Sequence, residues 1–286
     1  GPSAMAAIDW GDLTTVQPTE VLESRFPLHI EWTQLGLDSG GAGERRGGLG
    51  MRRALRLTRG NALYSLLSEG AIMPPFGIHG GETGAPVDSY VIGADGTEHR
   101  FDSPGKVGGH PLSEGDTVIL QSAAGGGYGD PLTRDPQDVR RDVQNDIVSQ
   151  EMAVRVYGVC FETNGDIAEE ATIKRRNDIS AGRPSLKTVR CTADPYVDSG
   201  PSKKRTIRLH PDDIVGASLE VGQKIELHDD IGAPLRGWLV ADPEVTLGTV
   251  PLDEKGITLL GVTENQSIRV RPLFTPQVVY RSAPVI

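Results

Sequence analysis

Three glycine-rich segments hold the residue types of this sequence that could do chemistry. The first, SGGAGERRGGLG at residues 39–50, surrounds Arg45 and Arg46 with glycine. Glycine lets a backbone approach a ligand where a Cβ atom would not fit, so the two guanidinium groups could meet a carboxylate or a phosphate. The segment lacks the spacing of a Walker phosphate loop. The alternative interpretation, which we favour, is a mobile loop with solvated charges.

The second segment, MPPFGIHGGETG at residues 73–84, places His79 directly before Gly80 and Gly81. An imidazole changes its charge near neutral pH and can move a proton, so His79 is a candidate catalytic or ligand-contacting residue. The other five histidines are scattered, and no pair has the spacing of metal ligands. We therefore expect no metal site in this chain, and we expect each of those five to be a surface residue or a hydrogen-bonded structural residue.

The third segment, AAGGGYGDP at residues 123–131, contains Gly125, Gly126, Gly127 and Tyr128. Successive glycine amides can form an anion-binding nest, especially between a strand and a helix. The alternative, which we favour, is a structural tight turn with Tyr128 packed beneath it. The sequence has no GxSxG elbow, and neither cysteine lies in a reactive setting, so nucleophilic catalysis has no support.

Composition excludes several classes of protein. The net charge of -10 and the aromatic content of 5% argue against binding of nucleic acid. Two cysteines cannot form a disulfide framework, which fits a reducing cytoplasm. No apolar run approaches the ~20 residues that cross a bilayer, so we expect no membrane span. Residues 1–17 are expected to be a tag remnant and an N-terminal extension.

The elements that must position the glycine segments are mostly short strands, because the chain has 36 Gly and 20 Pro and many turn signals. Residues 20–125 alternate apolar and polar side chains at strand period. Leu28, Ile30 and Trp32 are expected on one face of a strand, and Asp95-Gly96 at the turn of a hairpin.

Helices are predicted only after residue 134. Asp135 is suited to cap the first helix, with Pro136 at its first position. Ser149 is suited to cap a second helix, and Gly158 to end it in a left-handed conformation. The polar stretch 177–204 is predicted to be a linker.

Beyond the linker, residues 205–286 are predicted to form a small β-barrel domain. Strand-like runs recur at short, regular intervals, and they are expected at residues 205–210, 223–228, 235–240, 245–250, 257–262 and 267–272. The predicted fold class is mainly β with a few helices, α+β.

The glycine segments also carry a resemblance to a known family. PTEVLESRFPL, DSGGAGERRGGLGMRRALRL, PPFGIHGGETG, LSEGDTVILQSAAGGGYGDPLTRDPQDVRRDV and VSQEMAVRVYGVCFETNGDIAEEAT follow one another in the order of the C-terminal half of the hydantoinase B, 5-oxoprolinase and acetone carboxylase α-subunit family. The resemblance covers residues 18–176. The C-terminal part is not a region of that family, and faintly resembles a double-psi β-barrel.

The resemblance implies a subunit of an ATP-dependent complex that acts on a cyclic amide or a ketone. A hydantoinase A-like partner would bind ATP, and another chain would supply the N-terminal half of hydantoinase B with its divalent metal. In the family the metal-binding Asp and His residues lie in that N-terminal half, so the present chain is expected to be inactive alone. The competing hypothesis is a non-catalytic ligand-binding or assembly module.

Overall fold

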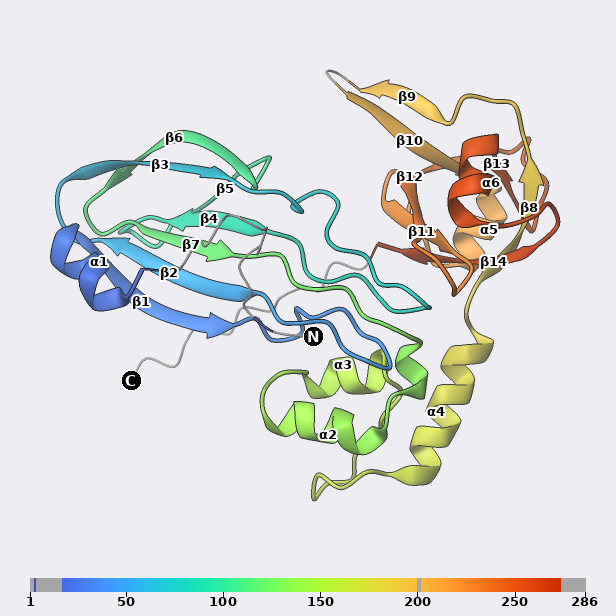
Figure 1. Ribbon diagram of the computed structural model, residues 1–286, viewed down its shortest axis with the longest axis horizontal. Helices are drawn as coiled ribbons and strands as arrows, with labels where there is room; N and C mark the ends of the chain where they lie inside the picture. Colours follow the sequence, from blue (N-terminus) through green and yellow to red (C-terminus); the bar gives the residue numbers. More distant parts are fainter. Residues whose placement is uncertain (1–2, 4–16, 200–201, 274–286) are drawn as a thin grey trace.

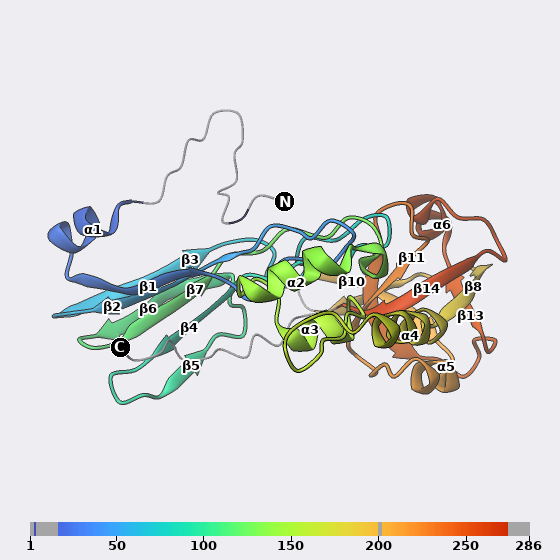
Figure 2. The ribbon, with the colours of Figure 1, turned by 90° about the horizontal axis from the view of Figure 1, so that it is seen from below.

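The computed structural model describes residue 3 and residues 17–199 and 202–273, and the described chain is elongated (Figure 1). A strand sandwich lies at one end, three helices run along one side, and a barrel lies at the other end (Figures 1 and 2). The elements of the sandwich are α1 (Thr19–Arg25), β1 (Leu28–Leu35), β2 (Met51–Leu57), β3 (Asn61–Leu67), β4 (Asp88–Ile92), β5 (Glu98–Arg100), β6 (Lys106–Ser113) and β7 (Thr117–Gln121).

The sandwich consists of one antiparallel sheet, in the order β1-β2-β7-β4-β5, covered by the antiparallel pair β3-β6. Buried Leu57, Val91, Leu112 and Val118 fill the layer between them. The two faces of β3 differ, because Ala62 and Tyr64 pack inward whereas Leu63 and Leu67 are exposed. This is the period-two alternation of a strand with one solvated face.

The expectation that Leu28, Ile30 and Trp32 share one face is wrong for Trp32. A β-bulge shifts the register of β1 between Ile30 and Trp32. Leu28 therefore packs into the layer under β3 and β6, whereas Trp32 packs with Ala54 on the opposite face of the sheet. One extra residue reverses every following side chain, and alternation alone does not reveal it.

The predicted hairpin is confirmed. β4 and β5 pair as antiparallel strands, Gly96 has φ 83°, and the Asp95 carboxylate accepts a hydrogen bond from the Thr97 amide at 2.9 Å. The prediction of no helix before residue 134 is wrong, since α1 and the short 3₁₀ helix η1 (Pro131–Thr133) precede it. A helix of seven residues, about two turns, leaves little periodic signal in the sequence.

Helices α2 (Pro136–Gln144), α3 (Gln150–Arg155) and α4 (Glu169–Ala181) follow the sandwich. Both predicted caps are confirmed: Asp135 accepts from the Gln137 amide and Ser149 from the Met152 amide. Gly158 is left-handed with φ 64°, although α3 already ends at Arg155.

The C-terminal region is a six-stranded barrel, and it confirms the predicted fold class. Its sheet runs β13-β8-β14-β11-β12-β10, with β9 added beside β10, and the outer members β10 and β13 lie against each other. Sixteen buried apolar side chains form its core. Its elements are β8 (Ser185–Arg190), β9 (Tyr196–Ser199), β10 (Ser202–Leu209), α5 (Pro211–Gly216), β11 (Lys224–His228), β12 (Leu235–Ala241), β13 (Thr249–Leu252), α6 (Glu254–Leu260) and β14 (Ser267–Pro272).

The barrel is built from two interlocked strand–strand–helix–strand units. The first consists of β8, β10, α5 and β11, and the second of β12, β13, α6 and β14. Two parallel pairs join the units, β8 with β13 and β10 with β12, and each pair takes one strand from each unit. Strand β11 of the first unit also pairs, antiparallel, with β14 of the second. This interlocking is the double-psi arrangement that the sequence faintly suggested.

Three stretches of this region differ from the sequence-based expectation. Of the predicted strand 245–250, only residues 249 and 250 lie in a strand, the start of β13. Residues 257–262, predicted as a strand, lie largely in α6, because Asp253 caps the Gly256 amide and left-handed Gly261 ends the helix. A short apolar run fits a strand and a buried helix equally well. The predicted linker 177–204 contains the end of α4 and β8, which pairs within the barrel. Among the described residues, no helix has the length and apolarity to cross a membrane.

Candidate functional site

The three glycine segments pack together as extended chains where they leave the sandwich (Figure 1). We define residues 36–50, 75–87 and 122–129 as the glycine bundle. Hydrogen bonds link its backbones: the Gly41 amide donates to Gly125 O at 2.9 Å, the Gly127 amide to Glu82 O at 2.8 Å, and the Glu82 amide to Ala42 O at 2.7 Å. Each segment thus satisfies the polar groups of its neighbours without forming a regular sheet.

Glycine is required in the bundle because the backbones touch. A Cβ atom on Gly126 would lie 1.9 Å from Phe76 O, and one on Gly127 would lie 1.9 Å from Ala42 O. One on Gly81 would lie 2.3 Å from Gly127 O. Real Cβ atoms do not approach backbone this closely, so these three predicted loop glycines serve chain-to-chain packing.

An open cleft of about 960 Å³ lies on the bundle and brings together several predicted site residues. Arg45, Arg46, Gly125, Gly126 and Tyr128 all line it. Arg45 and Tyr128 exchange two backbone hydrogen bonds of 2.9 Å, which fixes the rim of the cleft. The Arg45 side chain is exposed.

Arg46 is held inside the protein. Its Nε donates to Asp142 Oδ2 at 3.0 Å, and its Nη1 donates to Gly47 O at 2.7 Å. Arg134 donates to the same Asp142 oxygen at 2.8 Å. Arg46 therefore ties the glycine bundle to α2, and the interpretation of a mobile loop with solvated charges does not describe it.

His79 is exposed and has φ 53°, a left-handed conformation that a side chain rarely adopts. Its ring centroid lies 4.9 Å from that of Tyr128, in a tilted arrangement. The sequence placed these two residues in separate candidate segments, and the fold brings them together. No metal-ligating group of three or more His, Cys, Asp or Glu side chains occurs among the described residues.

A second, polar site lies where the barrel meets the glycine bundle, and sequence reasoning missed it. Glu226 on β11 is only 1% exposed. Its carboxylate accepts hydrogen bonds from Thr83 Oγ1 at 2.8 Å, from Arg236 Nε at 2.8 Å and from Arg271 Nε at 2.9 Å. Burial alone would raise the pKa of Glu226, but Arg271 and Arg236 outweigh it and hold that pKa below its usual value.

The two arginines of this network also bind backbone carbonyl groups in the bundle and directly before its second segment. Arg271 donates to Gly80 O at 3.3 Å and to Gly81 O at 2.7 Å, and Arg236 donates to Pro74 O. The predicted loop residues Gly80 and Gly81 therefore present their carbonyl groups to the barrel. The network fixes the barrel against this segment.

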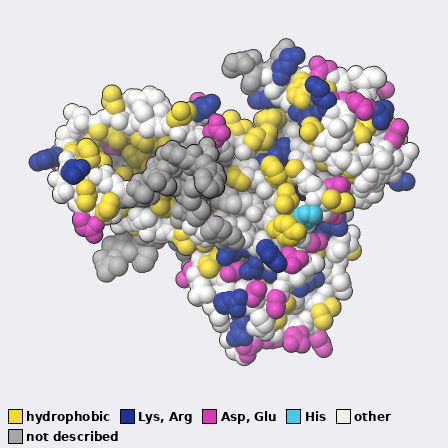
Figure 3. All heavy atoms as spheres, viewed as in Figure 1, with side chains coloured by type: hydrophobic (Ala, Val, Ile, Leu, Met, Phe, Trp, Pro, Cys, Tyr) yellow, Lys and Arg dark blue, Asp and Glu magenta, His cyan; other side chains and the backbone are white. Residues whose placement is uncertain are grey.

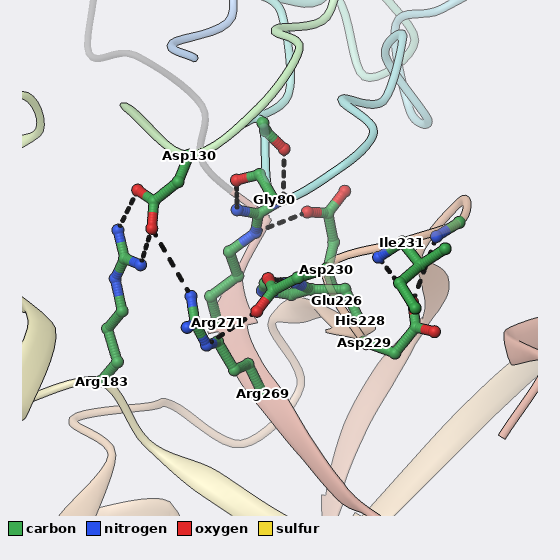
Figure 4. Close-up of polar contacts among 12 residues, drawn as sticks. Gly80, Asp130, Arg183, Glu226, His228, Asp229, Asp230, Ile231, Arg269 and Arg271 are labelled. Atoms are coloured by element: carbon green, nitrogen blue, oxygen red, sulfur yellow. Dashed lines mark hydrogen bonds and ion pairs between the residues drawn. The ribbon is translucent and has the colours of Figure 1, made fainter. Parts of the chain in front are cut away.

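Figure 4 shows a neighbouring set of ion pairs. Arg183, just after α4, forms a bidentate pair with Asp130 at 2.5 and 2.7 Å. Arg269 binds Asp230 at 3.1 Å and lies 3.9 Å from Asp130. His228 Nδ1 lies 2.9 Å from Asp230 Oδ1.

A weak signal for this site exists in the sequence. Glu226 and His228 alternate with Ile225 and Leu227 in one predicted strand, and charged residues alternate with apolar ones in 267–272. Alternation predicts that these polar side chains point away from the barrel core. It does not predict that the outward face is buried against another domain.

Comparisons with known proteins find relatives of the N-terminal region. Residues 1–131 match the family model Hydantoinase B/oxoprolinase, which confirms the predicted resemblance. An uncharacterized protein of Methanocaldococcus jannaschii is 37% identical over 142 residues, or 50% of this chain and 24% of that protein. The caprolactamase subunit beta of Pseudomonas jessenii is 35% identical over 164 residues, or 55% of this chain and 27% of that protein.

The fold of this region is shared with a solved acetone carboxylase. Its nucleotide-free structure aligns with a TM-score of 0.51 and 22% sequence identity, over 58% of this chain and 26% of that chain. The present chain thus spans less than a third of the length of these related proteins.

Proposed function

We propose, from the match of residues 1–131 to the Hydantoinase B/oxoprolinase family, that this chain is a subunit of an ATP-dependent complex that acts on a cyclic amide or a ketone. A hydantoinase A-like chain would bind ATP. A further chain would supply the N-terminal half of hydantoinase B and its divalent metal. The present chain would act as the scaffold on which that half is seated, and would be inactive alone.

The observation that carries this proposal is the glycine bundle. Its backbones interlock, and they hold a sandwich whose outer strand exposes Leu63 and Leu67, at 74% and 83%. Further exposed apolar side chains, Ile72 and Phe76, follow on the way into the bundle. Hydrophobic side chains gather on this face over the strands and again between the strands and the barrel (Figure 3). Exposed apolar side chains that gather in this way mark protein interfaces.

The test is reconstitution of the complex. The chain would be co-expressed with a hydantoinase A-type chain and with a chain carrying the N-terminal half of a hydantoinase B. We expect one assembly by size-exclusion chromatography with light scattering, and ATP hydrolysis that depends on a cyclic amide or a ketone. We expect the double substitution L63D/L67D to reduce assembly at least tenfold, because two charges would be buried in an apolar interface.

Leu259→Asp is the matched control, since Leu259 is 67% exposed on α6 of the barrel. It should leave assembly unchanged. If the wild-type chain fails to join either partner chain, or if both substitutions act alike, the sandwich face is not the proposed interface.

A second candidate function, a non-catalytic ligand-binding or assembly module, is favoured by the cavity between barrel and bundle. It predicts ligand binding without any effect on ATP hydrolysis by the reconstituted partner chains. Substrate-dependent ATP hydrolysis that requires the present chain would exclude it.

A further inference from the structure

Two histidines that the sequence analysis treated as scattered lie together at one edge of the sandwich. His99 is in β5, the last strand of the five-stranded sheet, and His110 is in β6, in the strand pair that covers that sheet. Their ring centroids are 4.6 Å apart and their planes differ by 19°, so the two imidazoles are stacked. His99 is exposed and His110 is half-buried. The pair therefore joins the two layers of the sandwich at a place that solvent can reach.

Phe101 supports both imidazole rings from the inside of the sandwich. Its ring meets His99 edge-on, with centroids 5.0 Å apart and planes at 73°, and meets His110 in the same way at 5.1 Å and 83°. Phe101 packs with Tyr64 against the apolar layer between the sheets. The two imidazoles are thus positioned by packing before any ligand is present, which lowers the cost of binding one.

The ring nitrogens of this pair are available for a ligand. His29 and His228, in comparison, each have Nδ1 only 2.9 Å from a carboxylate oxygen. Within the described ranges, no hydrogen bond or ion pair engages the ring of His99 or His110, and the nitrogens of His110 are not buried. Each ring can therefore offer a nitrogen lone pair to a group that comes from solvent.

The surroundings of the pair favour a metal ion that prefers nitrogen ligands. Neighbouring Glu98 and Arg100 bind each other, and Arg100 stacks on Tyr90 on the opposite face of the sheet. Since side chains alternate along β5, Glu98 points away from the face that carries His99. Mg²⁺ and Ca²⁺ require oxygen ligands, whereas imidazole suits Ni²⁺, Cu²⁺ and Zn²⁺.

We propose that His99 and His110 form a binding site for a divalent late transition-metal ion. Metal–nitrogen bonds of about 2.1 Å place two nitrogens on one ion roughly 3 Å apart. The stacked rings must therefore approach by on the order of 1 Å at one edge, which a rotation of the exposed His99 side chain supplies. No group of three or more metal-ligating side chains occurs in the described part of the chain, so water completes the coordination.

A bound ion would link β5 to β6 and so tie the two layers of the sandwich together. The site lies within this chain and is separate from the metal expected on a partner chain. The inference is independent of the proposed assembly into a complex.

The experiment is isothermal titration calorimetry of Ni²⁺ into the full chain, free of any histidine tag, near neutral pH. We expect one Ni²⁺ to bind per chain and Mg²⁺ to show no saturable binding. His99→Ala and His110→Ala should each weaken Ni²⁺ binding at least tenfold, because each removes one of the two protein ligands. Ni²⁺ should also raise the melting temperature of the wild type and of neither variant, since a ligand of the folded state stabilises it.

His29→Ala is the matched control, because the His29 side chain is 45% exposed and lies in the same sandwich. It should bind Ni²⁺ as the wild type does. Electron paramagnetic resonance of the wild type with one equivalent of Cu²⁺ needs no variant and should count two imidazole nitrogens on the ion. The proposal is overturned by a lack of saturable Ni²⁺ binding, by unchanged affinity in folded His99→Ala and His110→Ala, or by a single nitrogen on Cu²⁺.

Discussion

The glycine bundle and the barrel are stabilised in opposite ways. In the bundle, backbone lies directly on backbone, and Gly126 and Gly127 have no room for a single added carbon. In the barrel, sixteen apolar side chains such as Ile225 and Leu239 fill the interior. Bundle packing is therefore sensitive to atoms that are added, whereas barrel packing is sensitive to atoms that are removed.

The main-chain packing of the bundle leaves several of its side chains available for binding. Its segments are fixed by hydrogen bonds between main-chain atoms, so the side chains of Arg45, His79 and Tyr128 can point outward without a structural role in the packing. The barrel strand β11, in contrast, has structural side chains on both of its faces. Ile225 and Leu227 face its core, whereas Glu226 and His228 face the bundle.

The largest effect is expected from Gly127→Ala. The new Cβ atom would meet Ala42 O, so we expect a loss of about 4 kcal/mol or more in the free energy of unfolding of the N-terminal region. Urea denaturation followed by fluorescence of Trp32, in a chain with Trp10 and Trp238 replaced by Phe, measures this region. Gly108→Ala is the control, because Gly108 has open space around its Cα, and a change there under about 1 kcal/mol is expected. Equal effects at both glycines would contradict backbone contact as the determinant.

Leu239→Ala should lower the stability of the barrel by about 3 kcal/mol, because it leaves a cavity in a fully buried core. Here Trp238 is retained as the fluorescence probe, and Trp10 and Trp32 are replaced. Leu259→Ala, at an exposed position on α6, should cost under about 0.5 kcal/mol. Leu239→Ala would also be placed in the chain that retains only Trp32. If it shifted the Trp32 transition as much as the Trp238 transition, the two regions would unfold as one unit, and their stabilities could not be compared separately.

A smaller effect, confined to acid pH, is expected at the junction of the two regions. The lowered pKa of Glu226 means that its ionised form stabilises the folded state at pH values above the unfolded pKa of about 4.3. That contribution is lost as the pH falls through the lower, folded value. We expect the wild type to lose on the order of 2 kcal/mol on acidification through this group, as hydrogen bonds to a charged partner are lost.

Glu226→Gln removes this titration, so its stability should depend less steeply on pH between roughly 5 and 3. Urea midpoints measured across that range provide the test. Glu264→Gln should keep the slope of the wild type, since Glu264 is exposed. Identical slopes for wild type and Glu226→Gln would show that the Glu226 network does not carry the acid sensitivity.

Local chemistry made much of the fold predictable. Asp95-Gly96 predicted its hairpin, and Asp135 and Ser149 predicted the starts of two helices, because each of these residues acts on backbone groups within three positions of itself. The failures were also local in cause. The bulge after Ile30 inserts a residue without a distinctive pattern, and the run in α6 is too short to separate a helix from a strand.

The sequence by itself determined where the chain turns, where two of its helices begin, which segments need glycine, and which family the N-terminal region resembles. Tertiary structure alone decided that Thr83 would meet Glu226, 143 positions away, and that Glu82 and His228 would line one cavity. Turns and caps depend on neighbours along the chain. Burial of a polar side chain depends on which surfaces the folded domains bring together, and no local pattern specifies that.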